Sequence, residues 1–242
     1  MEQEPTNQGS VGGAPALRRS GVFVVVPAYN EAAGIEHVLR DLTSAPMTVV
    51  LVDDGSSDAT SSIAGRFTPH VVRHLVNRGQ GAALQTGIEF ALRRGALYIV
   101  TFDADGQHRV DDIAALIAPL AAGECDVTLG SRFLGQAIDI PRLRVLALKT
   151  AVLGTRLLSG MRLTDAHNGF RAFTRRAAQR IRISMDRMAH ASELVDLIRR
   201  EGFRYLEVPV EVRYTSYSLA KGQRVRDAVR TVSDYILDRL IG

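Results

Sequence analysis

Apolar residues follow two different periods along the first half of the chain. Uninterrupted apolar, mostly β-branched runs, the first at 22–26, predict strands of the kind that parallel sheets bury on both faces. Between the runs, apolar residues recur every three or four positions, as at Ile35, Val38, Leu39 and Leu42, which predicts amphipathic helices. The chain therefore begins as an alternation of buried strands and helices.

The alternation continues along most of the sequence. We predict further strands at 48–52, 71–76, 99–102, 125–133 and 204–214, and helices capped at Asn30, capped near Ser57, and within 77–95 and 109–123. Segment 134–163 is apolar and basic and lacks the pattern of short apolar runs bounded by turn residues that marks strands. It therefore predicts one or two helices. Strands that alternate with helices through short loops predict an α/β fold, a mostly parallel sheet with helices on both faces.

Composition divides the chain into three parts. Residues 1–20 are polar and contain Gly, Pro and Ser, which predicts a disordered N-terminal lead-in and not a signal peptide. Residues 21–222 form the predicted domain, and a chain of 242 residues that is 46% hydrophobic can bury a sizeable core. Residues 223–242 predict a C-terminal amphipathic helix that serves packing or an interface.

Charge and cysteine content narrow the range of partners. A formal net charge of +4 favours anionic partners but falls far short of a nucleic-acid-binding tail, so we expect no nucleic acid partner. Cys125 is the only cysteine, which excludes an internal disulfide and indicates a reducing compartment. No run reaches the roughly 18 to 20 apolar residues of a membrane span. We expect a cytoplasmic protein, peripheral at the inner face of the membrane.

Polar and acidic residues follow three of the predicted strands. They are Tyr29, Asn30 and Glu31 after the first strand, Asp53 and Asp54 after the second, and Asp103 and Asp105 after the fourth. A single aspartate at a strand end is usually a helix cap or a turn former. Several of them together repel one another unless a cation or hydrogen-bond donors neutralise them, and ligands of open α/β sheets bind at the carboxyl ends of strands.

The stretch Asp103-Ala104-Asp105 suits a divalent cation. Residues two apart in an extended segment point the same way, and Gln107 can add an amide oxygen on the same side. Such hard oxygen ligands favour Mg²⁺ or Mn²⁺. An EF-hand loop is excluded because Gly106 stands fourth from Asp103 and not sixth, and the chain has neither a P-loop nor a dinucleotide-binding fingerprint after its first strand.

Seven motifs carry a family resemblance. In order, "VVVPAYNEAAGI", "VLVDDGSSDAT", "NRGQGAALQTGIEFA", "DADGQH", "GSRF", "TDAHNGFRAF" and "EVPVEVRYTSYSLAKG" resemble the motifs of family-2 glycosyltransferases, which have the Rossmann-like GT-A fold. They are most similar to the polyprenyl-phosphate branch, which includes dolichyl-phosphate mannosyltransferases and glucosyltransferases. The resemblance covers about residues 21–222.

The resemblance implies a site for a sugar nucleotide and a metal ion. Residues expected to line the base and ribose are Pro27, Tyr29 and Glu31, with Asp53 and Asp54 accepting hydrogen bonds from the base. Asp103 and Ala104 are expected to touch the ribose and diphosphate. Asp105 and Gln107 are expected to hold Mg²⁺ or Mn²⁺ between the two phosphates.

It also implies roles for residues further along the chain. Arg132 and Lys221 are expected to donate charge-assisted hydrogen bonds to the departing diphosphate. Asp165 and Arg171 match positions on the acceptor side, and Asp165 is the candidate general base if the acceptor is a hydroxyl. Glu193 matches a helix acid that faces the site, with a solvated helix acid as the alternative.

One position departs from the mannosyltransferase pattern. Those enzymes carry an arginine six residues after the proline of "EVP", where this chain has Thr215. Arg213 lies two residues earlier and in an extended segment faces the same side as Thr215. It either takes the place of that arginine or lies at a solvated strand edge, so the identity of the donor stays open.

The reaction implied is an inverting, metal-dependent transfer of a hexose, mannose or glucose, from a GDP or UDP sugar to a polyprenyl phosphate. A phosphate monoester, with a second pKa of about 6, is already anionic and needs no general base. Arg142, Arg144 and Lys149 are then expected to attract the lipid phosphate or the membrane surface, with an ordinary amphipathic packing helix as the alternative. The alternatives are transfer to a saccharide or small-molecule hydroxyl, a nucleotide-sugar-binding subunit of a membrane complex, and dependence on a separate membrane partner.

Overall fold

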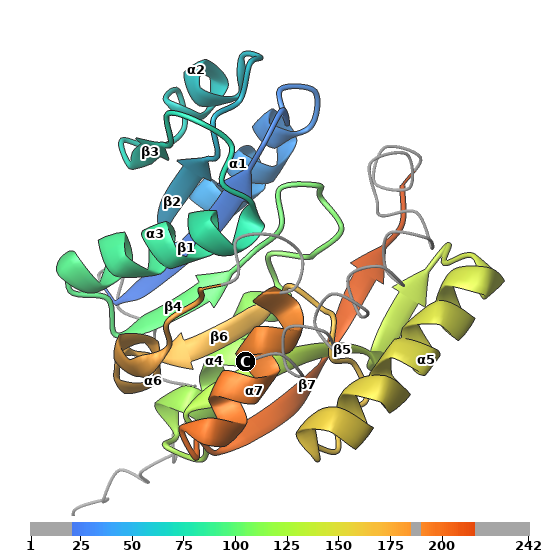
Figure 1. Ribbon diagram of the computed structural model, residues 1–242. Coiled ribbons are helices and arrows are strands. Elements are labelled where there is room, and N and C mark those ends of the chain that lie inside the picture. Colours follow the sequence, from blue (N-terminus) through green and yellow to red (C-terminus); the bar gives the residue numbers. More distant parts are fainter. Residues whose placement is uncertain (1–20, 185–189, 216–242) are drawn as a thin grey trace, which may run out of the picture.

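A computed structural model describes residues 21–184 and 190–215, whose centre is a seven-stranded sheet of order β3-β2-β1-β4-β6-β5-β7 (Figure 1). The strands are β1 (Val22–Ala28), β2 (Thr48–Asp53), β3 (Val71–Arg73), β4 (Tyr98–Thr101), β5 (Val127–Ile138), β6 (Arg171–Thr174) and β7 (Tyr205–Arg213). The helices are α1 (Ile35–Ser44), α2 (Thr60–Ala64), α3 (Gln80–Arg93), α4 (Asp112–Ala121), α5 (Arg142–Ser159), α6 (Arg175–Arg180) and α7 (His190–Arg200). Only β6 runs against the others, so the predicted mostly parallel sheet is confirmed.

Helices cover both faces of the sheet, as the sequence predicts (Figure 1). Val24 and Val26 of β1 pack into the core on the side of α1, α2 and α4. Phe23 and Val25 of the same strand pack into the core on the side of α3, α6 and α7. The run 22–26 is continuously apolar because alternate side chains enter two different cores.

Helix α3 approaches the sheet closely at a glycine. A Cβ atom built on Gly87 would lie 2.2 Å from Cγ1 of Val25 and 3.1 Å from Cγ2 of Val52. Real Cβ atoms do not approach other atoms so closely, so a larger residue would force α3 away from β1 and β2. This helix therefore packs against the sheet through a small residue.

The two predicted caps in the first half of the chain are wrong. Helix α1 begins at Ile35, beyond Asn30, and Asn30 has a φ of 53° in the left-handed region. Helix α2 begins at Thr60, and Oδ1 of Asp58 accepts its backbone N–H at 3.0 Å. Asn30 and Ser57 bond to each other instead, because tertiary contacts between two loops replace the local caps.

The segment after residue 133 also differs from the prediction. Strand β5 continues to Ile138 before a single helix, α5, begins at Arg142. Two short elements, β6 and α6, follow without having been predicted. Strand β6 has four residues, begins with a buried arginine and pairs with β4 and β5, so its pairing comes from tertiary position and not from a local pattern.

A bulge interrupts β5 where the sequence motif "GSRF" lies. The pairing of β5 with β7 shifts register between Ser131 and Gln136. Gly135 lies within the shift, where a Cβ would stand 2.2 Å from the carbonyl oxygen of Val210. Bulges change the direction in which side chains point. Arg132 directly follows Ser131, the last residue of β5 that is paired before the register shift.

Three sequence predictions concern residues outside the described ranges. They are the disordered lead-in at 1–20, the helix at 223–242 and the phosphate-binding role of Lys221. The domain boundaries at 21 and 222 likewise stay predictions.

Candidate active site

The loops after β1 and β2 form one hydrogen-bonded layer. The backbone N–H of Asn30 donates to Oγ of Ser56, and the backbone N–H of Ser57 donates to Oδ1 of Asn30, both at 2.9 Å. The backbone N–H of Glu31 donates to Oγ1 of Thr60 at 2.8 Å. These bonds hold the predicted nucleotide-binding residues of the two strand ends in one fixed arrangement.

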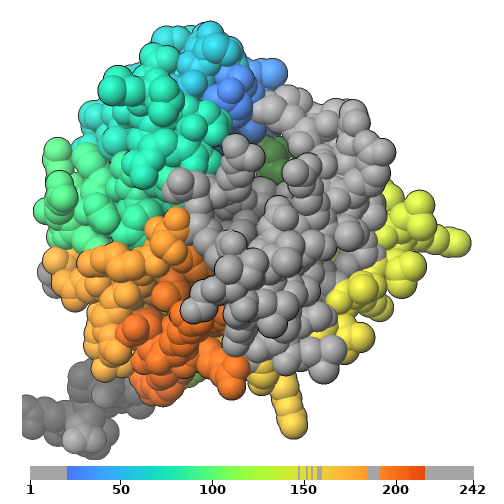
Figure 2. Space-filling model, viewed as in Figure 1, coloured from blue at the N-terminus to red at the C-terminus, as the bar shows by residue number. Residues whose placement is uncertain are grey.

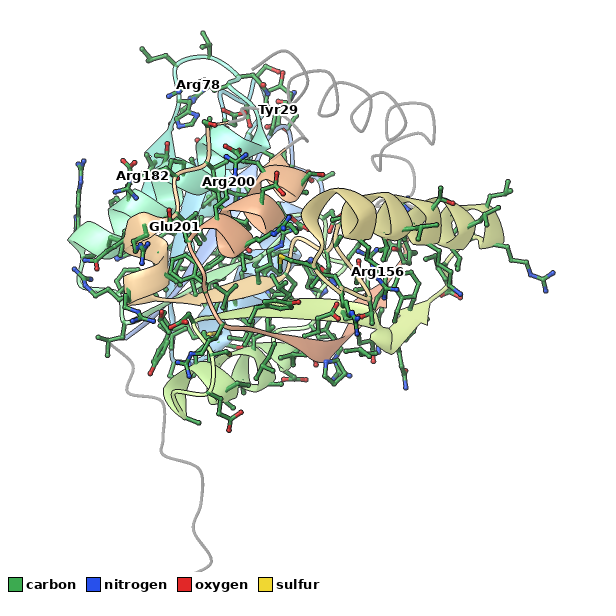
Figure 3. All side chains as sticks on the ribbon, turned by 60° about the horizontal axis from the view of Figure 1, so that its bottom comes forward. Tyr29, Arg78, Arg156, Arg182, Arg200 and Glu201 are labelled. Atoms are coloured by element: carbon green, nitrogen blue, oxygen red, sulfur yellow. The ribbon has the colours of Figure 1, made fainter. Side chains whose placement is uncertain are left out.

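Three of the residues expected to line the nucleotide near β1 and β4 differ in exposure. Tyr29 is 45% exposed, and in Figure 3 its side chain lies at the same end of the molecule as that of Arg78. Pro27 is buried within β1, and Ala104 is buried in the core. Of these residues, Tyr29 offers a side-chain surface to a ligand, whereas Pro27 and Ala104 shape the backbone beneath it.

Asp53 is buried at the end of β2, and its carboxylate bonds to the turn that follows this strand. Its Oδ1 accepts the backbone N–H of Ser56 at 2.8 Å, and its Oδ2 accepts the hydroxyl of Ser61. Nε of Arg73 lies 3.5 Å from the same Oδ2. The side chain of Arg73 is 58% exposed, so this ion pair connects the buried carboxylate with the surface.

Asp54, the next residue, holds a loop. Its Oδ1 lies 2.7 Å from Nδ1 of His74 and accepts the backbone N–H of Arg78 at 2.9 Å. Its Oδ2 accepts the backbone N–H of Gly79 at 2.6 Å. The other ring nitrogen of His74 lies 3.0 Å from the hydroxyl of Thr86 in α3. The carboxylate of Asp54 is thereby committed to positioning the segment between β3 and α3.

Asp103 stands two residues beyond β4 and is held by two side chains. Its Oδ1 accepts from Nε2 of Gln80 at 3.0 Å, and its Oδ2 lies 3.1 Å from Nε2 of His108. The imidazole of His108 stacks on the ring of Phe170 at 4.8 Å between centroids. A Cβ on Gly169 would lie 2.4 Å from Oδ2 of Asp103, so the carboxylate occupies the space that a side chain there would need.

Asp105 lies close enough to Asp103 for the two charges to interact. Burial, followed by the charge of Asp103, raises the pKa of Asp105 from 3.8 to about 6. His108 and a hydrogen bond from the backbone N–H of Gln107, at 3.1 Å, act in the opposite direction. Strand β4 ends at Thr101, so the two carboxylates meet because the chain turns at 104–106 and not, as the sequence suggested, because they alternate along a strand.

These residues fit a divalent cation that a substrate helps to bind. The charge of Asp103 disfavours the charge of Asp105, and a bound positive charge relieves this repulsion. Mg²⁺ is usually held by one or two carboxylates together with substrate phosphates. Among the described residues no three acidic, histidine or cysteine side chains form a complete metal site. Asp103 and Asp105 therefore offer part of a coordination shell, and the amide of Gln107 lies in the same turn, largely buried.

Arg132 and Asp165 form a buried ion pair. Asp165 accepts two hydrogen bonds on Oδ2, from the backbone N–H of Arg132 at 3.1 Å and from its Nε at 2.6 Å. Nη1 of Arg132 donates to the hydroxyl of Tyr214. Burial disfavours the charge of Arg132, but Asp165 and Tyr214 more than compensate and raise its pKa above the ordinary value. Arg132 therefore stays a cation although it is only 7% exposed.

Glu207 of β7 holds the backbone around Asp165. Its carboxylate accepts the backbone N–H groups of Thr164, at 2.8 and 2.9 Å, and of Asp165, at 3.0 Å. It also accepts the hydroxyl of Thr164, which lies 2.7 Å from the hydroxyl of Ser131. One glutamate thus ties the segment before β6 to the residue that precedes Arg132.

Arg171 connects the two groups of acids. It begins β6, where it pairs with Thr101 of β4 on one side and with β5 on the other. Burial lowers the pKa of its guanidinium to about 10, while the charges of Asp103 and Asp165 act to raise it. Its Nη2 donates to the carbonyl oxygen of Ala166 at 3.1 Å. The carboxylates of Asp103 and Asp165 therefore share one buried cation.

The structure adds four residues that motif analysis did not select: Gln80, Gly169, Glu207 and Tyr214. Each lies inside one of the motifs quoted above, so the motifs contained them without showing their roles. Their functions arise from contacts between elements far apart in sequence, such as the 82 residues between Arg132 and Tyr214.

Other predicted residues lie at the margin of the site. Nε of Arg213 pairs with Oε1 of Glu211, which also pairs with Arg109, and the side chain of Arg213 is 59% exposed. Glu193 of α7 accepts from the backbone N–H and the hydroxyl of Ser184. Arg213 thus stands in a surface cluster with an acidic partner, as its solvated alternative predicts.

Helix α5 presents apolar and basic side chains to the outside. Leu143, Leu146 and Leu153 are 76%, 64% and 57% exposed, respectively. Arg156 turns the other way and donates from Nε to the carbonyl oxygen of Leu163 at 2.6 Å (Figure 3). The helix occupies the edge of the molecule in the space-filling view (Figure 2). Within the described ranges, no helix combines the length and the apolar character needed to cross a bilayer.

Comparison with known proteins gives consistent matches. The sequence model described as "Glycosyl transferase family 2" matches residues 23–182. An uncharacterized protein of Methanocaldococcus jannaschii is 35% identical over 229 residues, covering 93% of this chain and 94% of its own. The UDP-N-acetylglucosamine–dolichyl-phosphate N-acetylglucosaminyltransferase of Methanococcus voltae is 32% identical, covering 84% of this chain and 90% of its own. The polyprenol monophosphomannose synthase of Mycolicibacterium smegmatis is 30% identical, with coverages of 88% and 86%.

A solved structure has the same fold. The glucosyl-3-phosphoglycerate synthase of Mycobacterium tuberculosis, crystallised with Mg²⁺ and uridine diphosphate, superposes with a TM-score of 0.65 over 89% of this chain and 79% of its own. At 20% sequence identity this likeness concerns the fold, and it confirms the predicted fold class.

Proposed function

Because the chain belongs to glycosyl transferase family 2, we propose that it transfers a hexose from a nucleoside diphosphate sugar to a polyprenyl phosphate. Relatives named for dolichyl-phosphate, polyprenol and undecaprenyl-phosphate substrates support a lipid phosphate acceptor. We infer a GDP or UDP donor carrying mannose or glucose, since the neighbouring fold was crystallised with uridine diphosphate and two relatives are named for mannose.

The donor would lie across the ends of β1, β2 and β4. The exposed ring of Tyr29 offers a stacking surface for the base, with Glu31 beside it. Asp53 and Asp54 are the proposed acceptors for the base; both carboxylates are buried and already bonded, that of Asp53 to Ser56 and Ser61 and that of Asp54 to His74 and two backbone N–H groups. The diphosphate would then approach Asp103 and Asp105.

Asp103, Asp105 and Gln107 would hold Mg²⁺ or Mn²⁺, which the diphosphate would complete. When bound, the ion supplies positive charge that stabilises the departing nucleoside diphosphate. The chain's own contribution is orientation: Gln80 and His108 fix the carboxylate of Asp103. Arg132 adds a buried cation whose plane is fixed by its bonds to Asp165 and Tyr214.

The burial and ion pairing of Asp165 support a phosphate acceptor over a hydroxyl acceptor. Its side chain is 0% exposed and ion-paired with Arg132, so it is neither accessible to a substrate hydroxyl nor an effective base. A phosphate monoester needs no such base, because at neutral pH one of its oxygens is already fully anionic. That oxygen would attack the anomeric carbon from the face opposite the leaving diphosphate and invert its configuration.

The outer surface of α5 supports a location at the membrane. Its exposed leucines lie among Arg142, Arg144 and Lys149, and no acidic residue occurs between Asp139 and Asp165. Apolar side chains interleaved with cations favour the interface of an anionic bilayer. We place the protein at the cytoplasmic face of a membrane, where its acceptor would be available.

The deciding experiment offers the purified protein a panel of GDP and UDP hexoses, with Mn²⁺ or Mg²⁺, and either a short polyprenyl phosphate or the matching polyprenol. We expect lipid-linked sugar from the phosphate and none from the alcohol. Asp105→Asn should abolish this product, and Asp111→Asn, at an exposed surface position, is the matched control. Transfer to the alcohol or to saccharide hydroxyls alone would refute the proposed acceptor.

A further inference from the structure

Tyr214, the residue after β7, touches two arginines that come from different elements. Its hydroxyl accepts from Nη1 of Arg132 in the β5 bulge. Its ring lies under the guanidinium of Arg144 from α5, with 5.0 Å between Cζ and the ring centroid. The tyrosine is 4% exposed, so both contacts are made out of bulk water. A single side chain thereby joins the basic helix to the buried cation of the site.

The backbone around Tyr214 is itself fixed. Its N–H donates to the carbonyl oxygen of Ile138 at the end of β5, at 3.0 Å. The preceding N–H, of Arg213, donates to the carbonyl oxygen of Gln107 at 2.9 Å. The phenol is therefore attached at its main chain both to β5 and to the turn that carries the metal-binding acids.

Two partners fix the plane of the Arg132 guanidinium. Asp165 takes Nε and Tyr214 takes Nη1, so the planar fork cannot rotate without breaking one of these bonds. Loss of the phenol oxygen would leave Nη1 buried without this partner while the ion pair with Asp165 remains. The charge of Arg132 would be kept and its orientation would be loosened.

Helix α5 contacts Tyr214 in its first turn. Its leucines at 143 and 146 face outward, and Arg144 is its residue in contact with Tyr214. A cation over a ring face is attracted by the ring quadrupole, more strongly where both are withdrawn from water. The ring face of Tyr214 is therefore a specific support for the first turn of α5.

We propose that Tyr214 is a positioning residue that orients Arg132 through its hydroxyl and seats Arg144 through its ring, so that the leaving-group cation and the acceptor-binding helix are set by one side chain. The acceptor half of this inference rests on the proposed function. The orientation of Arg132 does not, because it follows from the hydrogen bond alone.

Two substitutions separate the hydroxyl from the ring. Tyr214→Phe keeps the ring under Arg144, so we expect kcat to fall about 10- to 100-fold, as for other supporting contacts, with both KM values unchanged. Tyr214→Leu removes the ring as well, and should add a rise in acceptor KM equal to that of Arg144→Gln. Tyr205→Phe, at the start of the same strand, is the matched control and should leave all constants unchanged.

A double-mutant cycle tests whether the hydroxyl acts through Arg132. In an Arg132→Lys background, Tyr214→Phe should cause no further loss of kcat, because the fork it orients is gone. Circular dichroism at the assay temperature must show both variants folded. An unchanged kcat in Tyr214→Phe, or an equal fall in the Arg132→Lys background, would overturn the inference.

Failure of the proposed function gives a different result. If wild-type protein uses only hydroxyl acceptors, the polyprenyl phosphate assignment is wrong, and the same kcat comparison is made with that acceptor. Nuclear magnetic resonance of the arginine Nε–Hε groups provides a readout without any substrate. We expect the Arg132 resonance to shift in Tyr214→Phe and not in Tyr205→Phe, and an unmoved resonance would contradict the orienting role.

Discussion

The carboxylate of Asp165 accepts both the backbone N–H and the Nε–H of Arg132 on a single oxygen, at 3.1 and 2.6 Å. The neighbouring carboxylate of Glu207 is bonded to the backbone N–H of Asp165 itself. The acid that motif analysis offered as a general base is therefore the counter-ion of a buried arginine. The same aspartate would have to lose this partner before it could take a proton from a substrate.

Asp165→Asn should show this role. Removing one charge of a buried pair typically costs about 3–5 kcal/mol in the free energy of unfolding, which urea denaturation measures. We expect that loss together with a fall in kcat of about 100-fold, the scale reported for losing a fixed transition-state donor. The pH–rate profile should keep its shape, whereas loss of the acidic limb would identify Asp165 as a base.

Asp126→Asn is the matched control for that experiment. Asp126 is also buried, but its partners Arg176 and Arg204 have side chains that are 70% and 60% exposed. It lies at the opposite end of β5 from Arg132, beside the first pair with β7. We expect some loss of stability and no change in kcat.

The neighbouring carboxylates of Asp103 and Asp105 predict a pH dependence of stability. The pKa of Asp105 is raised by burial and by Asp103 from 3.8 to about 6, so between these values the folded state binds more protons than the unfolded state. Metal-free protein should therefore lose stability as the pH rises from 4 to 6 and then level off. The loss should be on the order of 2 kcal/mol, below the full value of the shift because the site is partly solvated.

Asp105→Asn provides the comparison. Without the ionisable group, the thermal midpoint of the chelator-treated variant should exceed that of the wild type at pH 7.5 and match it near pH 4. Added Mn²⁺ should stabilise the wild type above pH 6, because the metal binds the ionised carboxylate, and should leave the variant unchanged. Equal metal stabilisation of both proteins would argue against Asp105 as a ligand.

Substitution of Gly169 should cause a binding defect confined to the surroundings of Asp103. An alanine there would place its Cβ 2.4 and 2.7 Å from the two carboxylate oxygens of Asp103, which must then move away from Gln80 and His108. We expect Gly169→Ala to weaken Mn²⁺ and donor binding at least 10-fold in titration calorimetry, the scale of losing a supporting contact to a metal site. Gly65→Ala, whose Cβ meets nothing closer than 3.6 Å, should bind normally.

The exposed leucines of α5 predict membrane binding. Replacing Leu143 and Leu146 with glutamate removes apolar area and introduces charges that anionic lipids repel. At least about 10 times less of this variant should co-sediment with vesicles that contain phosphatidylglycerol, because each leucine side chain that no longer inserts into the bilayer costs about 1 kcal/mol or more of binding free energy. Leu97→Glu, at another exposed leucine, is the control, and equal binding by all three proteins would contradict the assignment.

The sequence predicted the parts of the fold that local patterns determine. The buried run of β1 and the stripe of α1 are visible because their side chains enter the core at a regular spacing. The caps failed because Asn30 bonds across to Ser57, an interaction that no local pattern encodes. Strand β6 was not predicted for a related reason, since its four residues are held by pairing with the strands on either side.

The residues of the candidate site were likewise predictable only in part. Motifs located Asp103 and Asp105, but the reason offered for their proximity, alternation along a strand, was wrong because β4 stops at Thr101. The partners of Arg132 were harder to foresee. A tyrosine in an apolar strand pattern is usually a core residue, and only the β5 bulge directs Arg132 toward Tyr214.

The antiparallel course of β6 has a consequence for how such proteins diversify. Because β6 is paired on both sides, by β4 and by β5, the chain between β5 and β6 leaves the sheet and returns to it as one contiguous excursion, residues 139–170. That excursion carries α5 and Asp165, whereas Asp53, Asp103 and Asp105 lie before it. Under the proposed function, exchange of this single segment between homologues would alter residues proposed for the acceptor side and leave the proposed donor residues unchanged.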